Sequence, residues 1–164
     1  MTAALAHVLR HNAWANRALL EHCVALEPGA LDLEAAGTYG TLYGTLQHLV
    51  GGEQFYIGLL TDDMLGAPVH KMERRALDDL MAISAMTGAR AIEIAASEDP
   101  DRVIGEADSD DWTTAGIVLA QLVNHGNEHR AHATTILGAK GRTPPKIGAW
   151  SYGIANGISK NDGD

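Results

Sequence analysis

Cysteine is almost absent from the sequence, since Cys23 is the only one among 164 residues. A chain with one cysteine cannot form an intramolecular disulfide, and this favours a reducing, cytoplasmic environment. The sequence also lacks a run of about 20 apolar residues, the length that a helix needs to cross a bilayer. The stretch MTAALAHVLRHNAWANRALL has no unbroken apolar segment of the kind found in secretory signals. We therefore expect a cytoplasmic protein without a membrane partner.

Basic residues are scarce as well. Lysine and arginine together number 12 against 21 acidic residues, which gives a formal net charge of −9. Proteins that bind nucleic acid contact the phosphate backbone through clusters of lysine and arginine, and the basic residues here are scattered. The composition therefore argues against a nucleic-acid partner.

Most of the chain has the periodicity of amphipathic helices, and no segment alternates with period two for long. Stretches rich in proline and glycine, such as EPGA and TDDMLGAP, separate four helical segments. Thr41 is a suitable N-cap for the second segment, and RVIGEA is short enough to be an extended link. The segments cover roughly residues 2–26, 41–60, 74–97 and 113–138. The pattern predicts one all-α domain over residues 1–164, a four-helix bundle with an irregular C-terminal tail.

The fourth segment contains the stretch LVNHGNEHRAH, with histidines at 125, 129 and 132. Projected at about 100° per residue, His129 falls within the apolar stripe and His125 and His132 on its shoulder, while Arg130 falls on the solvent side. An i, i+4 pair of inward imidazoles is a common way for a helix to offer two ligands to one metal ion. Burial of two imidazoles without partners costs several kcal/mol, so either a metal or mutual hydrogen bonds must satisfy them.

The second segment, TLQHLVGGEQFYIGLL, supplies a candidate third ligand, His48. The segment is apolar around most of its circumference, so His48 is expected to face protein. Gly51 and Gly52 weaken the helix by about 1 kcal/mol each relative to alanine, which indicates close approach of another group. Glu53 is a candidate buried carboxylate, with a salt bridge to an arginine of another helix as the alternative to a role in a metal site. The other four histidines, at positions 7, 11, 22 and 70, show no comparable pattern.

Four stretches match a known family in the expected order: HNAWANRALL, GTLQHLVGGEQFY, LVNHGNEHRAH and PPKIGAWSYGIANG. The chain resembles the DinB/YfiT-like superfamily of metal-binding four-helix bundles, which includes mycothiol-dependent maleylpyruvate isomerase-like and bacillithiol transferase-like proteins. The resemblance implies a long crossover between the second and third helices. It also implies a divalent metal ion, zinc or nickel, held by His48, His125 and His129. Many relatives have glutamine where this chain has His132, which leaves open a fourth protein ligand.

Three histidines around a divalent ion leave open coordination positions, as in catalytic sites. Such an ion activates water or holds a small thiol as its thiolate. We therefore expect a metal-dependent enzyme that acts on a small molecule, a thiol-dependent S-transferase or a hydrolase, in which His132 or Glu53 orients a ligand imidazole or moves a proton. Cys23 is expected in the core, because a lone cysteine on a helix is usually a core residue. A low-molecular-weight thiol as nucleophile would make a protein cysteine unnecessary. The alternatives are a non-catalytic metal-binding protein of the stress response and a purely structural bundle.

Two further expectations concern assembly and the tail. Relatives commonly form dimers through a face of the bundle, so a homodimer is expected. The apolar residues Trp150, Tyr152 and Ile154 are expected to pack back on the bundle near the metal and to wall its pocket.

Overall fold

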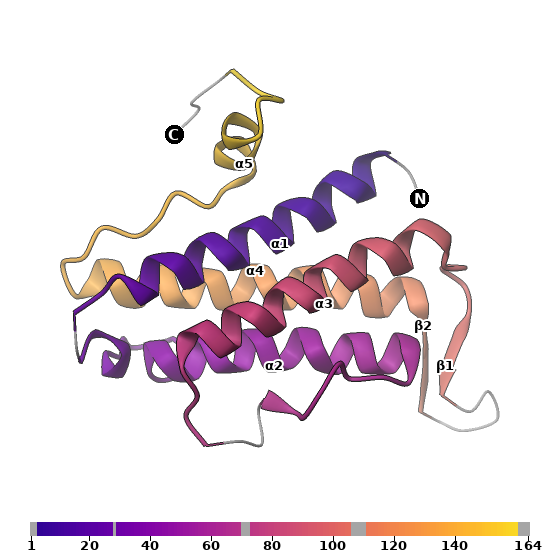
Figure 1. Cartoon of the computed structure of the whole chain (residues 1–164), viewed down its shortest axis with the longest axis horizontal. Coiled ribbons are helices and arrows are strands. Elements are labelled where there is room, and N and C mark those ends of the chain that lie inside the picture. The colour runs from indigo at the N-terminus through magenta and orange to yellow at the C-terminus, as the bar shows by residue number, and fades with distance from the viewer. Residues whose placement is uncertain (1–2, 28, 70–72, 106–110, 161–164) are drawn as a thin grey trace.

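The computed structural model describes residues 3–27, 29–69, 73–105 and 111–160, and it is dominated by helices (Figure 1). The all-α bundle expected from the sequence is confirmed, and a short hairpin and a small C-terminal helix accompany it. The elements are α1 (Ala3–Val24), the 3-10 helix η1 (Ala30–Asp32), α2 (Leu42–Thr61), α3 (Leu77–Ser97), β1 (Val103–Gly105), β2 (Trp112–Thr114), α4 (Ala115–Ala139) and α5 (Ala149–Ala155).

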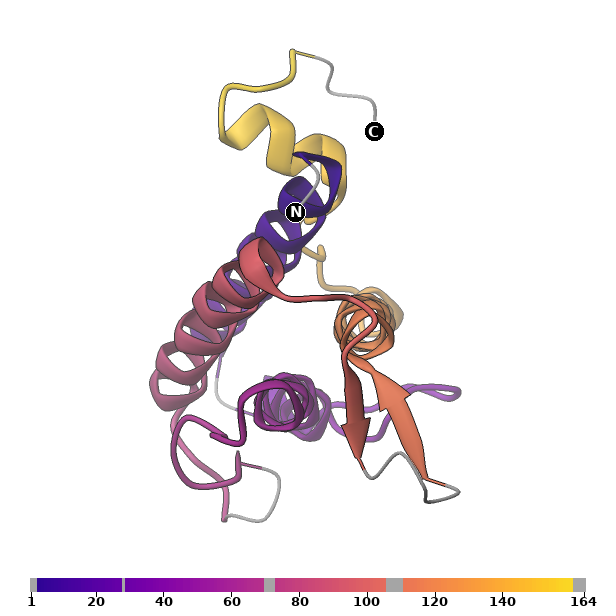
Figure 2. The ribbon, with the colours of Figure 1, turned by 90° about the vertical axis from the view of Figure 1, so that its right-hand side faces the viewer.

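The helices α2 and α3 run in the same direction, so the chain between them returns along the length of the bundle (Figure 1). This is the long crossover that the resemblance implies. Viewed along the bundle, α1 lies beside α3, and α2 and α4 form the other side (Figure 2). The antiparallel pair of α2 and α4 carries all three candidate metal ligands.

The ends of α2 follow from its flanking residues. The hydroxyl Oγ1 of Thr41 accepts a hydrogen bond from the backbone N–H of Gly44 at 2.9 Å, which satisfies one of the free N–H groups of the first turn. Asp62 ends the helix in the left-handed conformation with φ of 59°. The expected N-cap is therefore confirmed, and its position fixes where His48 lies along the bundle.

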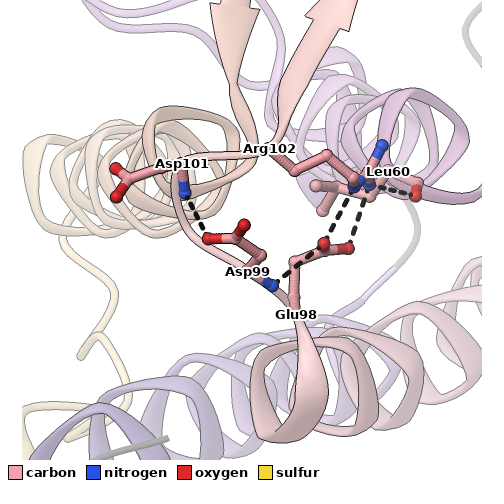
Figure 3. Close-up of polar contacts among 5 residues, drawn as sticks. All are labelled: Leu60, Glu98, Asp99, Asp101 and Arg102. Atoms are coloured by element: carbon pink, nitrogen blue, oxygen red, sulfur yellow. Dashed lines mark hydrogen bonds and ion pairs between the residues drawn. The ribbon is translucent and has the colours of Figure 1, made fainter.

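The link between α3 and α4 is an antiparallel hairpin in which Val103 pairs with Thr114. Arg102 ties it to the bundle: its guanidinium contacts both carboxylate oxygens of Glu98, at 2.8 and 2.9 Å, and donates to the carbonyl of Leu60 at 2.9 Å (Figure 3). These bonds hold the hairpin against the end of α2, beside the α2–α4 pair (Figure 2).

The core of the bundle has two apolar halves. One contains residues near the start of α2, the start of α3 and the end of α4, including Leu46, Leu80 and Ile136. The other contains residues near the end of α2 and the start of α4, including Ile57 and Leu122. Along each of the four long helices, buried polar residues separate the residues of one apolar half from those of the other. These polar residues are here called the central polar layer: Asn12, Asn16, Glu53, Ser84, Thr87 and Arg130.

The C-terminal tail packs on α1 and not at the metal ligands. Tyr152 is buried against the rings of His11 and Trp14, with centroids 5.8 and 5.7 Å away. Trp150 and Ile154 are exposed, at 57% and 41%. Because the chain that leaves α4 runs along α1 (Figures 1 and 2), α5 lies across the bundle from α2. The expectation that the tail walls the metal pocket is therefore wrong. Among the described helices, none is both long and apolar enough to cross a membrane.

Candidate metal centre

Three imidazoles meet between α2 and α4. His48, His125 and His129 each offer one ring nitrogen, and these nitrogens lie within 4.8 Å of one another. The ring centroids of His125 and His129 are 4.4 Å apart, and that of His48 is 5.0 and 4.6 Å from them. His125 and His129 are buried, and His48 is half-buried. The three residues expected from the helix faces are thus brought together, in an arrangement that could hold a metal ion.

The cluster depends on the absence of a side chain at Gly52, one turn after His48. A Cβ atom at this position would lie 2.2 Å from Cε1 and 2.6 Å from Nε2 of His125. Real Cβ atoms do not approach other heavy atoms so closely, so the His125 ring occupies the space that any larger residue would fill. The close approach expected from the two glycines is confirmed at Gly52.

The donor set suits a divalent metal. The Nδ1 atoms of His125 and His129 are buried and have no hydrogen-bond partner, which costs free energy unless another group satisfies them. Burial, with the neighbouring imidazoles, lowers the pKa of both histidines to about 4. Both rings are therefore neutral at pH 7, the form in which imidazole binds zinc or nickel.

His132 stands beside the cluster. Its ring centroid lies 5.3 Å from that of His129. Among the described residues, the group whose ligand atoms converge consists of His48, His125 and His129 and does not include His132. Its Nδ1 is buried and has no hydrogen-bond partner. His7, His11 and His22 lie on α1, apart from the cluster. His70 lies outside the described residues.

Glu53 belongs to the central polar layer. Its Oε1 accepts hydrogen bonds from the Nδ2 atoms of Asn12 and Asn16, both at 2.8 Å. Its Oε2 accepts from the hydroxyls of Thr87 at 3.0 Å and Ser84 at 3.3 Å. Burial raises the pKa of Glu53, and these donors together with the charge of Arg130 oppose the rise. Its hydrogen-bond partners thus lie on α1 and α3, whereas the imidazole cluster is formed by α2 and α4.

Arg130 completes this layer. The helical projection predicts that Arg130 faces solvent, but in the structure it is buried. Its Nη1 donates to Oδ1 of Asn12 at 2.7 Å and to Oδ1 of Asn16 at 2.6 Å. Each asparagine amide therefore joins Arg130 to Glu53, so the salt bridge considered for Glu53 takes the form of a charge pair linked through two amides. Burial lowers the pKa of Arg130 to about 10, and the guanidinium stays charged at pH 7.

Cys23 is 2% exposed, and burial raises the pKa of its thiol to about 12. A thiol that stays protonated at pH 7 is a poor nucleophile. Cys23 is therefore a core residue, as expected.

Two tyrosines that the sequence analysis did not single out border the cluster. Tyr39 stacks on His48, with ring centroids 4.1 Å apart and an interplanar angle of 19°, and meets His129 edge-on at 5.0 Å. Tyr56 meets His125 edge-on at 5.5 Å. Tyr56 could have been found from the sequence, because it follows Gly52 by four residues and His48 by eight. Tyr39 lies in a loop before α2, where helical periodicity gives no signal.

Comparison with known proteins decides the family. Residues 1–156 match the DinB family. The chain belongs to the DinB family. No protein of curated function matches the sequence. The match covers the two helices that hold the three imidazoles of this DinB protein. The family match and the convergence of the imidazoles together support a possible three-histidine metal site.

The contact at Gly52 leads to a first prediction. Gly52→Ala should displace the His125 ring and weaken zinc binding by about 10- to 100-fold, the range seen when groups supporting metal ligands are changed. Gly58→Ala is the matched control on the same helix, because its Cβ would meet mainly the flexible side chain of Met64. Both affinities are measured by competition with a chromophoric chelator. Equal zinc affinity in the two variants would contradict the role of Gly52.

The lowered pKa values lead to a second prediction. Protons compete with metal at His125 and His129 only near their pKa of about 4, so metal content should hold from pH 7.5 to about 5.5 and fall below that. In the metal-free protein, His125 and His129 take up protons near pH 6.5 when the chain is unfolded and only near pH 4 when it is folded. Stability is therefore expected to decrease as the pH falls from about 6.5 toward 4.

Metal analysis after dialysis at each pH tests the first part of this prediction, and urea denaturation with a chelator tests the second. Loss of half the metal already at pH 6.5, or constant stability of the metal-free protein down to pH 4.5, would contradict it.

Proposed function

We propose that this DinB protein is a divalent-metal-dependent enzyme that acts on a small molecule, as a thiol-dependent S-transferase or a hydrolase. The observation that carries the proposal is the convergence of His48, His125 and His129 to within 4.8 Å of one another. Three neutral nitrogen ligands fill only part of a coordination sphere, and sites with open positions are typical of catalytic metals. The homodimer expected from the resemblance stays a prediction.

A bound zinc or nickel ion would supply a Lewis acid that lowers the pKa of a coordinated water or thiol. The chain itself supplies the surroundings. Gly52 leaves room for the His125 ring, and Tyr39 covers one face of His48. His132 lies beside His129 with an unpartnered Nδ1, and we assign it the acceptance and return of a proton at that atom.

Glu53 has a supporting role in this proposal. Its carboxylate oxygens are engaged by Asn12, Asn16, Ser84 and Thr87, so it holds α2 in place against α1 and α3. Since His48 and Gly52 lie on the same helix, this positions the candidate ligands without contact to the substrate.

The deciding experiment couples elemental analysis of the purified protein to a transfer assay with a panel of low-molecular-weight thiols and electrophiles. We expect one equivalent of zinc or nickel per chain and turnover with at least one pair. Stoichiometric metal without turnover or ligand exchange would instead support a non-catalytic metal-binding protein of the stress response. Absence of metal would leave a structural bundle.

His132→Ala distinguishes a proton carrier from a fourth ligand, as a third prediction. We expect metal content to stay at one equivalent, because the ring lies outside the cluster, while turnover falls by about 10²-fold or more and its pH profile changes. His22→Ala removes another buried imidazole nitrogen without a partner and should leave both unchanged. Loss of metal from His132→Ala would make it a ligand and overturn the assignment.

A further inference from the structure

The candidate metal centre is surrounded by aromatic rings that remain accessible to solvent. Tyr39 stacks on His48, and Tyr56 meets His125 edge-on. Phe55 in turn packs against Tyr56, with centroids 5.6 Å apart. Tyr39 is 48% exposed and Phe55 is 46% exposed. Together with Gln121, whose Nε2 donates to the Tyr56 hydroxyl at 3.5 Å, these residues are called the rim: Tyr39, Phe55, Tyr56 and Gln121.

Exposed aromatic side chains beside buried polar ligands are a common feature of small-molecule sites, where apolar walls surround a few polar groups. An aromatic ring recognises flat, unsaturated groups through stacked and edge-on contacts. At this rim, the exposed rings of Tyr39 and Phe55 could make such contacts.

Positive charge is missing from the segments that form the rim. Residues 33–41 and the whole of α2 contain no lysine or arginine, and α4 contains only Arg130. Arg130 is buried against Asn12 and Asn16. At the hairpin end of α2, the charge of Arg102 is taken up by Glu98 (Figure 3). Exposed Glu128 lies next to His129 and adds negative charge.

The aromatic rings of the rim and the lack of positive charge around them both favour a neutral substrate over an anionic one. A carboxylate or phosphate at the rim would lose hydration without gaining a cation from any described residue of these segments. A neutral aromatic group would instead bury apolar surface against the two tyrosines and Phe55.

We propose, resting on the function proposed above, that the part of the substrate next to the metal is an uncharged aromatic or other flat unsaturated group, and that the rim excludes anionic groups there. The rim thus sets the specificity of the centre for neutral substrates.

The test uses the cobalt-loaded full-length protein and two matched thiols, benzyl mercaptan and 4-(mercaptomethyl)benzoate. The two share the thiol and the ring and differ in the carboxylate. Binding is followed by the thiolate-to-cobalt absorption band. We expect benzyl mercaptan to bind at least about tenfold more tightly than 4-(mercaptomethyl)benzoate. The difference should be smaller at high salt, because salt screens the repulsion between the carboxylate of the thiol and Glu128. Equal binding, or a preference for the carboxylate, would overturn the proposal.

Variants assign the preference to the rim. Tyr56→Leu should weaken binding of benzyl mercaptan, whereas Trp150→Leu, an exposed aromatic on α5, should not change it. Gln121→Lys introduces a cation on the exposed face of α4 and should raise the affinity for 4-(mercaptomethyl)benzoate relative to benzyl mercaptan. A preference that none of the rim variants changes would overturn the assignment to the rim.

The two proposals fail in distinguishable ways. If the wild-type protein takes up no cobalt or zinc, the metal-dependent function fails and the inference fails with it. If the protein holds the metal and binds the anionic thiol as well as the neutral one, only the inference about the substrate fails.

Discussion

Simultaneous replacement of His125 and His129 by alanine is expected to abolish stoichiometric metal binding. The double variant keeps only His48 of the three converging imidazoles, and a single imidazole does not hold zinc or nickel against a competing chelator. We expect the affinity to fall by at least three orders of magnitude, or about 4 kcal/mol. Turnover in the transfer assay should be lost with the metal.

The fold of this double variant should survive. The two rings bury nitrogens without hydrogen-bond partners, so their removal from metal-free protein gives up little polar stabilisation. Far-UV circular dichroism and urea denaturation in chelator check this. His22→Ala is the control, since it also removes a buried imidazole nitrogen without a partner but lies outside the cluster. A double variant that binds one equivalent of zinc as tightly as wild type would disprove the metal site and the function built on it.

The second large effect is expected at the charge pair of the central polar layer. Arg130→Met should lower the free energy of unfolding by about 3–5 kcal/mol, because Glu53 is left as a buried charge without its cation. Asn12 and Asn16 would also lose the donor that each accepts from. The measurement is urea denaturation of metal-free protein, so that metal binding does not contribute.

A double-mutant cycle separates the charge pair from simple loss of packing. Glu53→Gln removes the negative charge and retains an acceptor for the asparagines. The combination with Arg130→Met should therefore cost less than the sum of the two single changes, with a coupling of about 1 kcal/mol or more. Strict additivity, or a loss below about 1 kcal/mol for Arg130→Met alone, would show that the pair does not stabilise the bundle.

Much of the fold was predictable because the relevant signals are local. Helical periodicity and the flanking proline, glycine and threonine residues place the helices within a few residues of their observed bounds. The three imidazoles were predictable because the helical projection places them on or beside the apolar faces of their helices. The two glycines after His48 indicated the close approach of another group, which in the structure is the His125 ring at Gly52.

The sequence could not place Arg130, because the projection assigns one buried direction to each helix. The helix α4 has two, one toward the imidazole cluster and one toward the central polar layer. The partners that bury Arg130 lie on α1, more than a hundred residues away. The prediction for the tail was wrong for a related reason. The apolar residues Trp150 and Ile154 gave no information on which face of the bundle receives α5, and both are exposed in the structure.

The two faces of α2 and α4 have a consequence for how new activities could arise in this bundle. The rim residues make none of the hydrogen bonds that hold the central polar layer together, and all four are partly or wholly exposed. Substitutions at Tyr39, Tyr56 or Gln121 would therefore change what reaches the centre with little loss of stability. The protein is thus suited to laboratory evolution, in which libraries confined to the rim could diversify the accepted substrates while the scaffold tolerates each change.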